Sequence, residues 1–91
     1  YMDGGISHLD TFDPKPLLAT KHGEPFPMPI VANQFDSNGP ILKSPWKFAQ
    51  NGQSGLWISE LFPHLARHAD KLAIVRSMTN ESGIHATANY W

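Results

Sequence analysis

The sequence predicts an α/β fold, and two neighbouring elements carry that prediction. A helix is expected over residues 59–69, because Ser59 is a good N-cap and apolar residues follow it at helical spacing. Residues 71–78 come after a very short link, and their compact run of apolar, partly β-branched residues predicts a buried strand. Helix, short link and buried strand are typical of layered α/β folds. An earlier strand is expected to end at Tyr1 and Met2.

Length and composition set the outer limits. The 91 residues suffice for a single small domain over 1–91, and the 41% hydrophobic content with three tryptophans is compatible with a globular core. A formal charge of −1 gives no field for steering nucleic acid or anionic membranes, so neither is expected as a partner. Without cysteine there is no disulfide or thiolate metal site, and no apolar run approaches a membrane span. Oligomeric state does not follow from these features.

Residues 23–45 form a connector within this domain that is rich in proline and glycine. Before it, residues 17–22 are expected to form one or two helical turns closed by Gly23. Residues 24–29 alternate proline with other residues, which predicts extended chain. A weak strand over 30–35 and a turn over 36–40 complete the connector.

Aromatic residues cluster after the connector. Trp46 and Phe48 alternate around Lys47, which suits either a short strand or a loop held by two aromatic anchors. Residues 50–55 then read as a polar loop before the helix. Trp46, Phe48 and Trp57 are compatible with carbohydrate binding, although aromatic residues in small folds commonly serve as core anchors.

Residues 2–16, MDGGISHLDTFDPKP, carry the densest set of polar side chains. Glycines permit close backbone approach to an ion, and the set Ser7, His8, Asp10 and Asp13 offers ligands for a hard or borderline cation. The same residue types also cap turns by bonding their own backbone. Both interpretations stay open for this stretch.

A second polar loop covers residues 79–85 and precedes an alanine-rich stretch that suits the start of a helix. In open α/β sheets ligands bind beyond the carboxyl ends of strands, and both polar loops follow predicted strands. The two loops are therefore candidates for one site. His85 could accept a phosphoryl group, bind metal or act as general acid and base, and Thr87 and Ser82 are alternative hydroxyls.

Four stretches in order, GGISHLDTFDPKP, LKSPWKFAQNGQSGLWISELFPHLA, DKLAIVRSMTNES and the His85 segment, resemble the domain-of-unknown-function 1501 (DUF1501) family. This resemblance implies an exported, sulfatase-like protein of the alkaline phosphatase superfamily, periplasmic or extracellular. It also implies that residues 1–91 are the N-terminal part of a larger layered sheet with flanking helices. The family itself has no assigned activity.

The resemblance also implies roles for two residues. Asp3 stands where superfamily hydrolases place their first metal-binding carboxylate, and His85 stands where they place the nucleophile. The implied activity is metal-dependent hydrolysis of sulfate or phosphate esters, with a divalent metal and a small-molecule or carbohydrate ester as substrate. The alternative is a non-catalytic secreted binding or structural protein that retains the fold.

Overall fold

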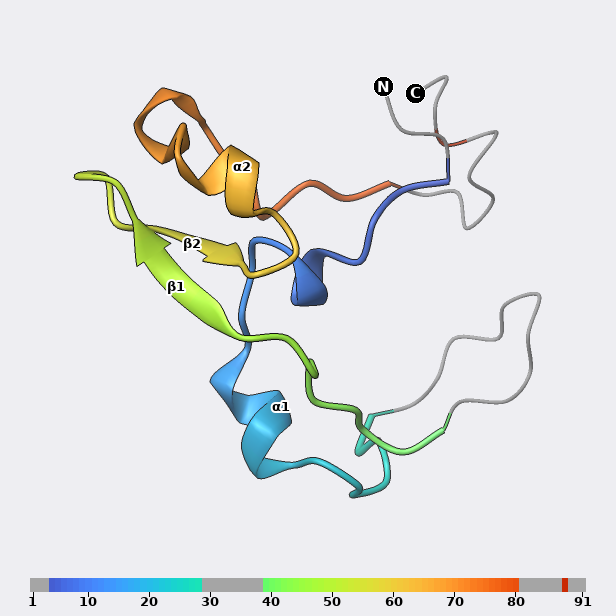
Figure 1. Ribbon diagram of the computed structural model, residues 1–91. Coiled ribbons are helices and arrows are strands. Elements are labelled where there is room, and N and C mark those ends of the chain that lie inside the picture. Colours follow the sequence, from blue (N-terminus) through green and yellow to red (C-terminus); the bar gives the residue numbers. More distant parts are fainter. Residues whose placement is uncertain (1–3, 29–38, 81–87, 89–91) are drawn as a thin grey trace.

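The computed structural model describes residues 4–28, 39–80 and 88. The described chain contains two short α-helices, two short 3₁₀-helices and one antiparallel hairpin (Figure 1). In chain order these are η1 (His8–Asp10), α1 (Pro16–Thr20), β1 (Phe48–Asn51), β2 (Leu56–Ser59), α2 (Pro63–Ala66) and η2 (Ala69–Lys71). The combination of helices with a two-stranded sheet agrees with the α/β class. Within these residues no helix is long and apolar enough to cross a membrane.

The hairpin pairs β1 with β2 in a register that places Phe48 opposite Ser59 and Gln50 opposite Trp57. Its turn contains Gly52 and Gly55, with φ angles of +66° and +65°. Glycine reaches this left-handed region without the steric cost that a Cβ brings. The polar loop predicted for residues 50–55 is therefore mainly a hairpin turn, and the strand that follows it was not predicted.

Asp70 in η2 fastens the hairpin turn to the helical part of the chain. Its Oδ1 accepts a hydrogen bond of 2.8 Å from the backbone N–H of Ser54. Backbone hydrogen bonds from Ser54 and Gln53 hold the pKa of Asp70 below its ordinary value. The carboxylate also lies directly against Gly52, where it would meet any added Cβ. The turn therefore depends on both glycine geometry and Asp70.

The single helix predicted over residues 59–69 is wrong. Ser59 ends β2, α2 begins only at Pro63, and η2 follows as a separate turn. In a helix capped by Ser59, Pro63 would fall at the position whose N–H makes the first i→i−4 bond, and proline has no N–H. Starting at Pro63 removes that conflict, because the first helical position needs no such donor.

The buried strand predicted over residues 71–78 is also wrong. Residues 72–80, called the extended segment below, have no strand assignment, and Val75 and Met78 are 67% and 79% exposed. Apolar, β-branched composition favours extended backbone, but a strand also needs a second backbone to pair with. In the described part of the chain only β1 and β2 pair with each other.

The short helix expected over residues 17–22 is present as α1, although α1 begins at Pro16 and ends at Thr20, and Gly23 after it has a φ of +84°. Two backbone hydrogen bonds then bring the two sides of the connector together. The N–H of Gly23 donates to the Ile41 carbonyl at 2.8 Å, and the N–H of Ile41 donates to Glu24 at 2.9 Å. The strand expected over residues 30–35 and most of the turn expected over 36–40 lie outside the described residues.

Few apolar side chains are fully buried in the described chain. Ile58 and Ala69 are 2% and 1% exposed, and the other buried residues are the polar Thr11, Asp13 and Ser59. Hydrogen bonds and ion pairs must therefore fix much of the arrangement, because buried polar groups require partners.

We expect Gly52→Ala to destabilise the protein more than Gly23→Ala. Both positions have positive φ, which costs alanine about 1–2 kcal/mol, but only at Gly52 would the methyl group overlap the Asp70 carboxylate. A Cβ at Gly23 meets nothing within 4 Å. Urea unfolding of the full-length protein should show losses of about 1 kcal/mol for Gly23→Ala and about 2 kcal/mol or more for Gly52→Ala. Equal losses would contradict the proposed contact between Asp70 and the turn.

Candidate functional site

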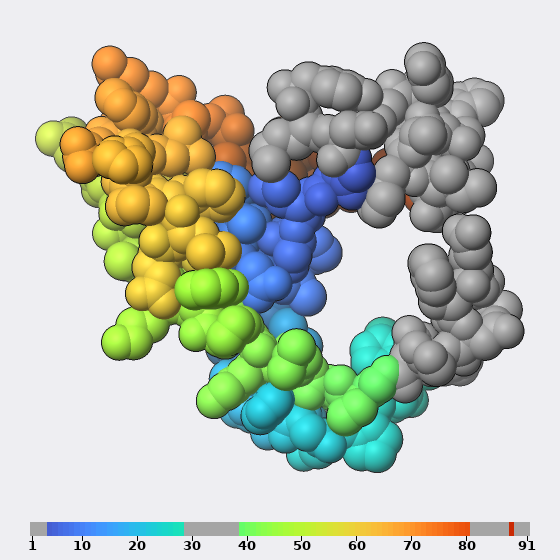
Figure 2. Space-filling model, turned by 45° about the vertical axis from the view of Figure 1, so that its right-hand side comes forward, coloured from blue at the N-terminus to red at the C-terminus, as the bar shows by residue number. Residues whose placement is uncertain are grey.

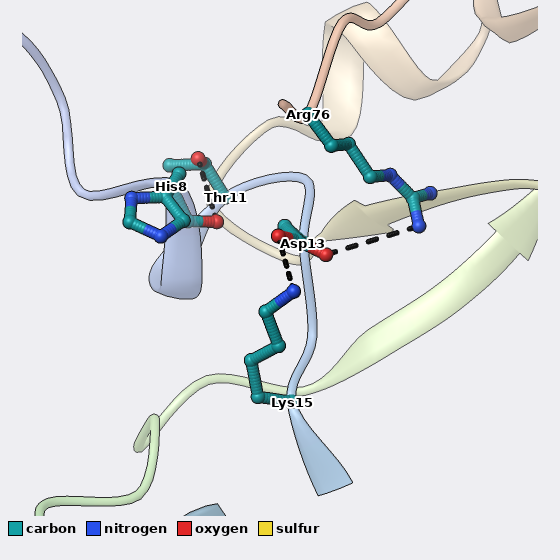
Figure 3. Close-up of polar contacts among 5 residues, drawn as sticks. All are labelled: His8, Thr11, Asp13, Lys15 and Arg76. Atoms are coloured by element: carbon teal, nitrogen blue, oxygen red, sulfur yellow. Dashed lines mark hydrogen bonds and ion pairs between the residues drawn. The ribbon is translucent and has the colours of Figure 1, made fainter. Parts of the chain in front are cut away.

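Residues 7–13, called the signature loop below, fold back on their own backbone. The carbonyl of His8 accepts amide hydrogen bonds from Thr11, Phe12 and Asp13 at 3.1–3.3 Å. The buried Thr11 hydroxyl donates to the Ser7 carbonyl at 2.8 Å, and lies 3.4 Å from that of His8 (Figure 3). These bonds use the local turn chemistry expected for this composition.

The signature loop is docked on the end of the hairpin. The N–H of Ser59 donates to the Thr11 carbonyl at 2.8 Å. The rings of Phe12 and Phe62 stack with centroids 5.4 Å apart and planes 3° from parallel. The ribbon and the space-filling view both show the N-terminal segment against the segment around β2 (Figures 1 and 2). One backbone bond thus fixes the loop to β2, and one aromatic pair fixes it to the start of α2.

Asp13 lies at the centre of a charged cluster at this junction. Its side chain is 8% exposed, and its Oδ2 lies 2.7 Å from the Lys15 ammonium. Its Oδ1 lies 3.8 Å from Nη1 of Arg76, which approaches from the extended segment (Figure 3). The hydrogen bond from Lys15, followed by the positive charges nearby, holds the pKa of Asp13 below its ordinary value. The carboxylate is therefore ionised and paired.

Asp10 has a comparable structural engagement. Hydrogen bonds from Ser44 and then Ser7 hold the pKa of Asp10 below its ordinary value. Ser44 lies just before Trp46, so this contact ties the end of the connector to the signature loop. Ser7 and His8 are exposed.

A cavity of about 220 Å³ lies between the signature loop and the extended segment. Its lining comes from both segments and from Ile6, just before the signature loop: Ile6, His8, Thr11, Phe12, Asp13, Ile74, Val75, Arg76 and Met78. Beyond it, the Asn80 side chain donates a hydrogen bond of 3.2 Å to the Ala88 carbonyl. The signature loop and the extended segment, which are far apart in sequence, therefore lie side by side. Asp3, Ser82, His85 and Thr87 lie outside the described residues.

Two described members of the predicted ligand set, Asp10 and Asp13, are held by contacts within the chain. Among the residues that the structure describes, no three His, Asp or Glu side chains are grouped so that they could hold one. Asp13 faces two cations, and Asp10 accepts hydrogen bonds from serines. Turn and ion-pair roles account for both carboxylates without a metal.

A second hollow of about 430 Å³, called the aromatic groove below, lies between α1 and the hairpin. It is lined by Leu9, Pro14, Lys15, Pro16, Leu18, Ala19, Lys43, Ser44, Trp46, Phe48, Trp57 and Arg76. Sequence reasoning singled out its aromatic residues but missed the cations. Because Lys15 lies only two positions after Asp13, their ion pair could have been expected from the sequence. Nothing in the sequence near Arg76 indicates that it pairs with Asp13.

We expect Asp13→Asn to lower stability at neutral pH and to reduce the loss of stability on acidification. The pKa of Asp13 is lower in the folded state than the ordinary 3.8, so the ionised carboxylate contributes its full stabilisation of the folded state above that value. The contribution is lost as the pH falls through the folded-state pKa. Unfolding of the full-length protein, followed from neutral pH to below pH 3.8, measures this difference.

The matched control is Glu24→Gln, which breaks the exposed pair between Lys21 and Glu24. It should change the free energy of unfolding by no more than about 0.5 kcal/mol at neutral pH. If the free energy of unfolding falls by the same amount with pH in wild type and in Asp13→Asn, the role given to Asp13 is contradicted.

Comparison with known proteins gives one match, which is to a protein family. No curated protein and no solved structure matches the chain. A family described as "Protein of unknown function (DUF1501)" matches residues 1–91, the whole of the sequence. The resemblance carried by the signature loop and the later stretches is thereby confirmed. The chain belongs to the DUF1501 family.

Proposed function

We propose that the chain is the N-terminal part of an exported, sulfatase-like hydrolase of sulfate or phosphate esters, with a layered fold of the alkaline phosphatase type. The observation that carries the proposal is the shared cavity between the signature loop and the extended segment. Those two segments lead in sequence to Asp3 and to His85, the residues that the family resemblance places at the reacting centre.

Chain length permits the two residues to meet at one site. Asp3 precedes Ile6 by three residues, and His85 follows Asn80 by five. At about 3.5 Å per residue these distances span at most about 10 Å and 17 Å. Both side chains can therefore reach the region next to the cavity.

In this proposal Asp3 would be a metal ligand, and His85 would act at the reacting centre. A divalent metal, when bound, supplies Lewis-acid polarisation of an ester oxygen. Thr87 and Ser82 are the alternative hydroxyl groups. Asp10 and Asp13 act as positioning residues, because their engagement in the signature loop fixes the backbone that follows Asp3.

The second candidate function is a non-catalytic secreted binding or structural protein. The observation that favours it is the structural use of both signature carboxylates, which leaves the signature without a described metal ligand group. A relative that has lost the chemistry would still need Asp10 and Asp13 to hold the loop.

We expect Asp3→Ala and His85→Ala to separate metal binding from turnover in the full-length protein. Asp3→Ala should lower the bound divalent metal measured by elemental analysis. His85→Ala should retain metal but lose about 100-fold or more in turnover of aryl sulfate or aryl phosphate esters. His64→Ala, an exposed histidine in α2, is the matched control and should behave as wild type.

Unchanged turnover in both variants would overturn the site assignment. A wild-type protein that holds no metal and turns over neither ester would overturn the hydrolase proposal and favour the binding protein.

A further inference from the structure

The aromatic groove presents two large exposed indole rings beside an apolar floor. Trp46 and Trp57 are 43% and 38% exposed. Leu18 and Ala19 of α1 and the prolines that flank Lys15 supply apolar lining. Its volume of about 430 Å³ lies within the range of small-ligand sites.

The hairpin register explains why its aromatic residues face the same side. Trp57 is opposite Gln50, and Phe48 lies two residues from Gln50 on the same strand. Directly opposed residues and residues two apart share one face of a sheet. Phe48 and Trp57 therefore belong to the face that looks toward α1, whereas the buried Ile58 belongs to the other.

The charges along the groove have one sign. Lys15, Lys43 and Arg76 line it, and its described lining contains no Asp or Glu. Asp13 contacts Lys15 and Arg76, and Asp10 accepts a hydrogen bond from Ser44 of the lining, so three cations stand against two carboxylates. The positive charge is local, because the whole chain carries a formal charge of −1. This favours a short anionic ligand, such as a few charged sugar units, over a long nucleic acid.

We propose that the aromatic groove binds a sulfated sugar chain. The partly positive C–H face of a pyranose ring would pack on the negative faces of Trp46 and Trp57. Sulfate groups on the ring would accept hydrogen bonds from Lys43 and from the outer donors of Lys15 and Arg76. The inference rests on the proposed function in choosing sulfate among anionic groups and in taking the bound ester as a substrate; the binding of an anionic sugar depends on the groove alone.

The test is calorimetric binding to the full-length protein carrying His85→Ala, so that hydrolysis does not interfere. Short dextran sulfate should bind at least about tenfold more tightly than neutral dextran of equal length or inorganic sulfate. Trp46→Ala and Lys43→Ala should each weaken binding about tenfold, which corresponds to about 1.4 kcal/mol. The matched controls Phe26→Ala and Lys71→Ala remove an exposed ring and an exposed cation outside the groove and should leave binding unchanged.

Circular dichroism establishes that each variant is folded. If Trp46→Ala does not fold, Lys43→Ala still tests the groove, because it leaves every aromatic ring in place. Equal binding by the groove variants and the controls would overturn the inference. So would tighter binding of a polyglutamate peptide than of dextran sulfate. If the groove binds dextran sulfate but the wild-type protein, which retains His85, turns over no ester, only the hydrolase proposal is overturned. Turnover of small aryl sulfates with no groove-dependent binding would overturn only this inference.

Discussion

The described structure depends above all on the buried carboxylate of Asp13. It joins Lys15, which leads into α1, to Arg76, which belongs to the extended segment. Only Ile58 and Ala69 are fully buried apolar residues among those described, so packing alone does little to fix these segments. Leaving the buried carboxylate without its partners is costly, which gives this cluster control over the local arrangement.

The same cluster connects the fold with the aromatic groove. Lys15 and Arg76 use part of their donor capacity on Asp13 and also line the groove. Arginine carries five N–H donors and lysine three, so each can serve a carboxylate and a second anion together. Asp13 thereby holds the cations in place while leaving a positive surface for an anionic ligand.

The sequence predicted the elements that local chemistry determines. The helical turns expected before Gly23 are present as α1, and Gly23 has the positive φ that a turn after a helix requires. It did not predict β2, because Ser59 is an equally good helix cap and its actual partner, Thr11, lies far away in sequence. Nor did it choose between metal binding and turn capping for Asp13, whose partners in the structure are the nearby Lys15 and the distant Arg76. The contacts of Ser59 and Arg76 are non-local, and local sequence patterns do not reveal them.

The extended segment shows how such a non-local pair bears on function. Its composition is typical of a strand, yet in the described chain an ion pair and a shared cavity, rather than a sheet, place it beside the signature loop. If Asp3 and His85 form one reacting centre, their approach depends on this contact. The pKa of Asp13 is held below its ordinary value, so the ion pair persists across the pH range in which histidine titrates. The contact between the two segments therefore does not depend on a change in the protonation of Asp13 within that pH range.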